Sequence, residues 1–294
     1  MPFSHFLLAL VVVFVWGTNF VVIKWGLDDL PPFLFASLRF IFSALPWLLF
    51  IKRPAVAWRT LIMVGILMGA GQFGLLYWAM QKDISPGLAS LVIQSQVFFT
   101  IGMAVVFSGE RIRPLQCGAL ALAVCGYGVV GWRGATDPST TVTLLGLSVV
   151  LAAAFSWACA NMLVRSAGRV NMLAFVIWSS VFSVPPVLAL SLTLEGPGLM
   201  LDSLASAGWT AWLAVAWQAL GNTLFGFGAW NWLLARHPTT IILPLALLIP
   251  VFGLLASVIL LGETMPGWKW LSTGLVMAGL ALNMWAARRP ARKA

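Results

Sequence analysis

The sequence predicts an all-α integral membrane protein whose ten transmembrane helices form two inverted five-helix repeats. Hydrophobic residues make up 61% of the 294 residues and charged residues 9%, whereas a soluble domain carries about 25% charged residues. Apolar runs long enough to cross a bilayer follow one another along the chain, and residues of the first half recur in the second. Lipid must therefore cover most of the surface, and a lipid bilayer is the expected environment.

Ten apolar runs are candidates for membrane spans, because each approaches the ~20 residues that cross a bilayer as a helix. The run from Phe6 to Ile23 is not followed by a small-residue cleavage site, which indicates a retained helix rather than a signal peptide. The expected spans are 4–26, 33–51, 60–80, 87–107, 114–132, 143–164, 172–193, 208–234, 239–261 and 267–287.

The basic residues predict the orientation of the chain. A net charge of +9 would also suit a nucleic-acid partner, but Lys and Arg lie between the apolar runs rather than in one patch, so no nucleic acid is expected. Twelve of them lie in the C-terminal tail and one set of alternate connectors, and three lie in the other set. Positive residues stay on the cytoplasmic side, which predicts cytoplasmic termini in the cell (inner) membrane.

Weak internal similarity predicts the two repeats, residues 1–137 and 138–294. Trp16 and Lys24 match Trp157 and Arg165 at a constant offset, and a Gly-Glu pair at 109–110 recurs at 262–263. Because five spans is an odd number, the second repeat enters the membrane from the opposite side. Inverted repeats of this kind are typical of secondary transporters. The alternative is chance similarity between aromatic-rich helices.

The residues that recur also resemble a known family. Trp16-Gly17-Thr18-Asn19-Phe20, Gly109-Glu110-Arg111 and the run from Pro86 to Gln94 are similar to segments of the drug/metabolite transporter superfamily, in its EamA-type branch of ten-helix carriers. The resemblance implies a secondary transporter that exports small polar metabolites by alternating access. Amino acids or derivatives such as cysteine and O-acetylserine are the implied substrates, and no cofactor is implied.

Uncharged polar side chains inside the spans are the candidates for substrate binding, because such side chains are costly in lipid unless they face protein or a water-filled cavity. Asn161 lies one helical turn after Trp157, and Gln94 one turn after Ser90. The alternative role is hydrogen bonding between neighbouring helices. Gln94 and Gln96 point ~200° apart on a helix, so at most one faces the cavity. The candidate residues are Trp16, Asn19, Gln72, Ser90, Gln94, Trp157, Asn161, Asn222, Trp230 and Asn231.

Three charged residues near or within spans are candidates for gating or ion pairing: Arg39, Glu110 and Glu263. Arg39 is suited to bind a substrate carboxylate or to pair with Asp28 or Asp29, and the pairing is the favoured interpretation. The two glutamates follow turn-forming glycines at span ends, where gating and helix anchoring are both consistent with the pattern, anchoring being favoured.

Other function classes lack sequence support. No acidic cluster, H-E-x-x-H motif or nucleotide-binding glycine loop occurs, so neither a catalytic nor a metal site is expected, although a membrane-embedded enzyme remains the rival class. A channel-like facilitator is the second rival. No Asp or Glu lies in mid-span, so proton coupling has no positive signal. The sequence does not indicate an oligomeric state.

Overall fold

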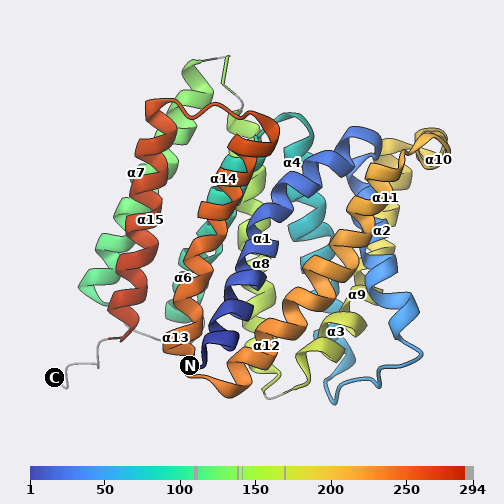
Figure 1. Cartoon of the computed structure of the whole chain (residues 1–294), viewed down its shortest axis with the longest axis horizontal. Helices are drawn as coiled ribbons and strands as arrows, with labels where there is room; N and C mark the ends of the chain where they lie inside the picture. Colours follow the sequence, from blue (N-terminus) through green and yellow to red (C-terminus); the bar gives the residue numbers. More distant parts are fainter. Residues whose placement is uncertain (109–111, 138, 141, 169, 289–294) are drawn as a thin grey trace.

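The protein is a bundle of helices that run between two opposite faces (Figure 1). The computed structural model describes residues 1–108, 112–137, 139–140, 142–168 and 170–288. Within these residues there is no strand, and the only β-type pairing is an isolated bridge between Ile84 and Val142. The N-terminus and the end of the last helix lie at the same face (Figure 1). We call the opposite face, which carries the connectors around residues 30, 84 and 264, the distal face.

The helices follow the apolar runs closely. Several segments join end to end into one longer helix, as Trp58–Lys82 does from three pieces. The elements are α1 (Phe3–Asp29), α2 (Pro32–Ala44), η1 (Leu45–Trp47), α3 (Trp58–Ile66), η2 (Leu67–Gly74), α4 (Leu75–Lys82), α5 (Pro86–Val92), η3 (Ile93–Ser95), α6 (Gln96–Ser108), α7 (Pro114–Thr136), α8 (Leu144–Ser166), α9 (Met172–Leu190), η4 (Ser191–Glu195), α10 (Pro197–Ser206), α11 (Trp209–Ala216), η5 (Trp217–Phe225), α12 (Gly226–Arg236), α13 (Thr239–Ile242), η6 (Leu243–Leu247), α14 (Leu248–Leu261) and α15 (Gly267–Arg288).

Eight helices in the described part of the chain are long and apolar enough to cross a membrane, or nine if a bent pair counts as one span. The bent pair joins α10 to Trp209–Arg236 at 103°. The expected span 33–51 is shorter in the structure, since its helix covers Pro32–Trp47, about 24 Å at 1.5 Å per residue. The multi-pass helical class is thus confirmed.

Irregular helical turns occur at corresponding places in the two halves. The third and eighth expected spans each contain a π-helical stretch, η2 and η5, and the fourth and ninth each contain a 3₁₀ stretch, η3 and η6. A backbone carbonyl in each π-helical stretch accepts a hydrogen bond from the first helix of the other half, Leu67 from Ser156 Oγ and Asn222 from Trp16 Nε1. Such π-helical turns are rare and often mark functional sites.

The last helices of the two halves, α7 and α15, pack side by side at one edge of the molecule (Figure 1). A Cβ built on Gly126 would lie 3.0 Å from the Ser272 carbonyl oxygen, and one on Gly279 would lie 2.7 Å from the Ala119 carbonyl oxygen. The two glycines let the backbones approach closely, as small residues do in membrane proteins. The contact is reciprocal, because each helix presents its glycine to the backbone of the other.

Candidate functional site

A polar cluster in the interior surrounds Arg39 on α2, which is only 1% exposed. Its Nη1 donates to Tyr77 Oη at 3.0 Å and to Gln218 Oε1 at 3.1 Å, and its Nη2 donates to Thr223 Oγ1 at 3.1 Å. The guanidinium also lies over the Phe73 ring, 3.5 Å from the centroid. Phe73 belongs to η2, and Gln218 and Thr223 to η5. The two π-helical stretches therefore meet at one buried cation.

The favoured pairing of Arg39 with Asp28 or Asp29 is wrong. Asp28 pairs with Lys24 at 2.7 Å, one helical turn away, and Asp29 accepts a hydrogen bond from the Gly208 backbone N–H. Both aspartates lie at the end of α1, where closer donors are available, whereas Arg39 points into the bundle. Among the described residues, every hydrogen-bond acceptor of Arg39 is neutral.

Several buried polar atoms in the same interior have no hydrogen-bond partner among the described residues. They are Arg39 Nε, Gln218 Nε2, Gln72 Oε1 and Asn19 Oδ1. Buried polar groups in folded proteins are nearly always paired, and an exception calls for an explanation such as a bound water or ion. These four atoms give the interior spare donors and acceptors, which a small polar ligand is suited to use.

Trp16 lies against the π-helical stretch of the second half. In addition to its hydrogen bond to the Asn222 carbonyl, its ring lies 5.2 Å from that of Trp230. Gly226 makes room for it, because a Cβ there would lie 2.3 Å from Trp16 Nε1. The structure thus brings Trp16, Asn222 and Trp230 together. Asn231 instead donates to the Phe227 carbonyl of its own helix.

The polar residues of the fourth and sixth spans mostly contact neighbouring helices. Asn161 Nδ2 donates to Gln96 Oε1 at 3.1 Å, so Gln96, rather than Gln94, meets this candidate residue. Ser90 donates to the Gly87 carbonyl and faces Gly253 on α14, where a Cβ would lie 2.5 Å from Ser90 Oγ.

Two further candidates of these spans differ in how they are held. Gln94 is 6% exposed, and its side chain makes no hydrogen bond to another described residue. Trp157 packs, partly buried, against the main hydrophobic core.

Glu263 anchors three segments at the distal face. It forms an ion pair with Lys269 at 2.8 Å, with the two side chains 6% and 2% exposed. It also accepts hydrogen bonds from Ser85 Oγ, Ser257 Oγ and the Gly87 backbone N–H. Burial raises the pKa of Glu263, but the bonds from Lys269, Ser257 and Ser85 and the Lys269 charge outweigh burial and lower it. Glu110 lies outside the described residues.

Carboxylates join the two halves at several other points of the distal face. Glu195 accepts from the backbone N–H groups of Phe33 and Leu34 at the start of α2, and Asp83 accepts from Thr143 Oγ1. The Glu195, Asp29 and Glu263 contacts place anions on otherwise unpaired N–H groups at helix starts, where negative charge is stabilised. We call these four contacts the distal latches: those of Asp29, Asp83, Glu195 and Glu263.

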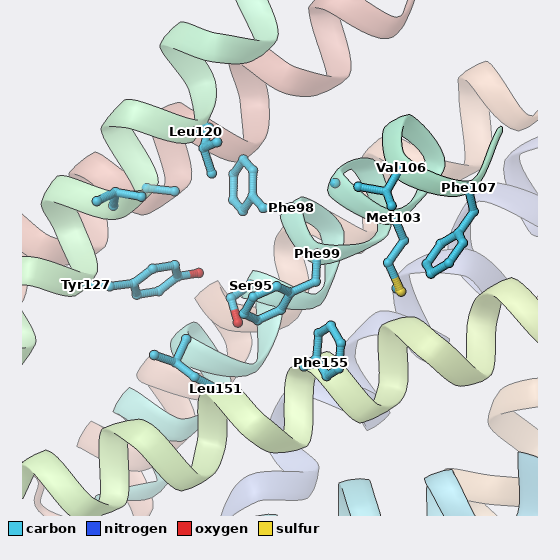
Figure 2. Close-up of a pocket in the computed structure, with 13 residues that line it drawn as sticks. Ser95, Phe98, Phe99, Met103, Val106, Phe107, Leu120, Tyr127, Leu151 and Phe155 are labelled. Carbon is cyan, nitrogen blue, oxygen red and sulfur yellow. The ribbon is translucent and has the colours of Figure 1, made fainter. Parts of the chain in front are cut away.

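An apolar cavity of about 680 Å³ lies elsewhere, in a groove between α6, α7 and α8. Figure 2 shows Phe99, Phe155 and Tyr127 converging on it. Its lining is almost entirely apolar, and Val106 and Phe107 at its edge are 75% and 77% exposed. None of the candidate substrate-binding residues lines it. Apolar side chains of this kind are also expected on a lipid-facing surface, so the groove could not be predicted from the sequence.

The sequence prediction missed Tyr77 and Thr223 as partners of Arg39. Tyr77 is one of two tyrosines in the chain and the only signal available was a phenol in an apolar run. The described residues contain no group of three or more His, Cys, Asp or Glu side chains that could hold a metal ion.

Comparisons with known proteins agree with this architecture. The sequence model of the EamA-like transporter family matches residues 4–132 and again 144–285. A "probable amino-acid metabolite efflux pump" of Salmonella typhimurium is 40% identical over 97% of each chain. One of Escherichia coli with the same description is 39% identical over 96% of this chain and 95% of its own.

More distant similarities also extend over almost the whole chain. A "probable terminal-alkyne amino-acid exporter" of Streptantibioticus cattleyicolor is 26% identical over 96% of this chain and 94% of its own. A crystal structure titled only "Crystal structure of protein" has a TM-score of 0.62 and 21% identity, with 99% of each chain covered, and supports the fold. The chain is therefore a multi-pass membrane protein that belongs to the EamA-like transporter family.

Proposed function

We propose that this protein is a secondary transporter that exports amino acids or their derivatives, such as cysteine and O-acetylserine, by alternating access. The observation that carries the proposal is the 40% identity, over 97% of each chain, to a protein described as a probable amino-acid metabolite efflux pump. The buried polar interior around Arg39 supports it, because zwitterionic substrates need both hydrogen-bond donors and acceptors. A membrane-embedded enzyme has no motif in its favour.

The proposed architecture is ten crossings in two inverted repeats, residues 1–137 and 138–294. The double match of one family model supports it. So do the reciprocal glycines of α7 and α15 and the paired π-helical stretches. In this arrangement, the two crossings beyond the eight long helices are the short helix Pro32–Trp47 and the bent pair.

The proposed substrate path runs through the interior where the two halves meet. Asn19, Gln72 and Asn222 are each 5% exposed or less, and two of them hold an unpaired amide oxygen. Trp16, Trp157 and Trp230 supply apolar walls. Because these residues are covered, the path is closed in this conformation, and a rearrangement must expose it.

The distal latches form the proposed gate. With the termini cytoplasmic, as the positive-inside rule predicts, the distal face is external to the cytoplasm and the latches close it. Opening toward the outside would require Glu263 and Glu195 to break their hydrogen bonds to the backbone N–H groups at the helix starts. A C-terminal reporter that is active only outside the cytoplasm would contradict this orientation.

Export is tested in cells that overproduce the protein, by measuring extracellular cysteine and O-acetylserine. We expect accumulation with the wild type and its loss with Asn19→Ala and Trp157→Ala. Trp270→Ala, a 61% exposed tryptophan of α15, serves as the matched control and should behave as wild type. If both interior variants reach the membrane and export normally, the proposed path is wrong.

A further inference from the structure

The strongest unexplained feature of the interior is a charged side chain that has no counter-ion among the described residues. Arginine stays protonated in proteins, and Arg39 is 1% exposed. A buried cation is strongly unfavourable unless an anion or a complete set of hydrogen bonds compensates it. Arg39 Nε has no partner among the described residues, so the compensation in this conformation is incomplete.

Four carboxylates of the distal side are engaged elsewhere. Asp28 pairs with Lys24, and Glu263 pairs with Lys269. Glu195 accepts from the start of α2 and Asp29 from Gly208. Recruiting any of these four carboxylates to Arg39 would leave its present partner unsatisfied.

The surroundings of Arg39 hold its guanidinium in place without neutralising it. Phe73 covers one face, and Tyr77, Gln218 and Thr223 accept hydrogen bonds as neutral groups. These residues come from both halves and from both π-helical stretches. A rearrangement between the halves therefore changes the contacts of Arg39 directly.

We propose that Arg39 recognises the carboxylate of the transported molecule. The substrate carboxylate accepts hydrogen bonds from the Nε and Nη2 edge of the guanidinium, displacing Thr223, and supplies the missing negative charge. Guanidinium and carboxylate match in planar, two-bond geometry, and such charged bonds are stronger than neutral ones. The inference rests on the proposed export function and narrows the substrate class to molecules with a free carboxylate.

The sharpest variant is Gln218→Glu, because Gln218 Oε1 already lies 3.1 Å from Arg39 Nη1. The substituted carboxylate becomes a permanent counter-ion of nearly the same shape, so the protein should fold while the attraction for a substrate carboxylate is lost. Arg39→Gln removes the cation itself. Gln116→Glu at the start of α7, whose side chain accepts from the Arg113 backbone N–H, is the matched control.

Binding is measured on the purified protein in detergent and chloride-free buffer, with labelled cysteine and O-acetylserine as probes and their carboxamides as competitors. We expect the wild type and Gln116→Glu to prefer the carboxylate over the carboxamide by about 10- to 100-fold. Gln218→Glu and Arg39→Gln should lose this preference. Counterflow in proteoliposomes is measured on the same proteins.

Three results would overturn the inference. The first is a Gln218→Glu protein that is stable and keeps the wild-type preference. The second is a wild type that transports the probes but binds acid and carboxamide equally, which leaves the export function standing. The third is displacement of the probes by chloride as effectively as by a second carboxylate, which would mark a general anion site. If the wild type neither binds nor transports any probe, the proposed function fails together with the inference.

Discussion

Substitution of Glu263 by Gln should destabilise the protein strongly, because it leaves a buried ammonium group without its anion. The Glu263 and Lys269 side chains are 6% and 2% exposed, and their charged atoms lie 2.8 Å apart. Removing one partner of a buried ion pair costs about 3–5 kcal/mol. For a chain of this size, such a loss lowers the unfolding temperature by roughly 10 °C. In addition, the Gln side chain has an NH₂ group in place of one of the two carboxylate oxygens, which accept hydrogen bonds from Ser85, Ser257 and Gly87.

The assay is thermal unfolding of the purified protein in detergent, followed by tryptophan fluorescence. Asp28→Asn is the control, because the Lys24–Asp28 pair is 35% and 54% exposed and such pairs contribute about 0–1 kcal/mol. The double variant Glu263→Gln/Lys269→Met should recover part of the loss, since it removes the unpaired charge. Equal unfolding temperatures for Glu263→Gln and Asp28→Asn would refute the reasoning.

The remaining predictions concern pH and helix packing. The pKa of Glu263 in the folded protein lies below its ordinary value of 4.5, so the ionised carboxylate stabilises the fold above pH 4.5. The difference in unfolding temperature between wild type and Glu263→Gln should therefore shrink as pH falls below 4.5. The pKa of His237 lies below 6.5, chiefly because of desolvation. The nearby charges of His5, the amino terminus and Arg236 lower it further. The folded protein therefore favours neutral His237, and its stability should fall as pH drops below 6.5. His237→Asn should reduce this dependence of the unfolding temperature on pH. Gly126→Ala should destabilise by about 1–3 kcal/mol, since its Cβ would lie 2.6 Å from Val276 Cγ2, whereas Gly128, with nothing within 4 Å, should tolerate alanine. Equal unfolding curves for these two variants would contradict the α7–α15 packing.

Much of the fold could be predicted from the sequence, because lipid imposes a minimum length on each apolar helix. The expected span 4–26 lies within α1, Phe3–Asp29, and 239–261 coincides with the segments from α13 to α14. The prediction was poorer at 33–51, where the helix ends at Trp47. It also missed α10, which lies in a connector and does not have the length of a span. The π-helical stretches depend on contacts between helices, so no local pattern predicts them.

The candidate site was harder to predict because its contacts join distant parts of the chain. The position of Arg39 near a helix entrance favoured Asp28 and Asp29 as its partners, but its actual partners Gln218 and Thr223 lie in the second half. The spacing of polar residues along a helix shows which of them share a face, but not which neighbouring helix that face contacts. Asn161, for example, bonds to Gln96 rather than to Gln94. Tertiary packing decided each of these outcomes.

The most direct test of the account is counterflow in proteoliposomes that contain the purified protein. Liposomes preloaded with unlabelled cysteine or O-acetylserine are diluted into a trace of the labelled compound, with and without a pH gradient. Alternating access predicts transient, saturable accumulation of label that depends on the preloaded substrate. Equilibration of label at a rate proportional to its concentration and independent of preloading would indicate a channel. The absence of flux for cysteine, O-acetylserine and every other amino acid tested would contradict the export function.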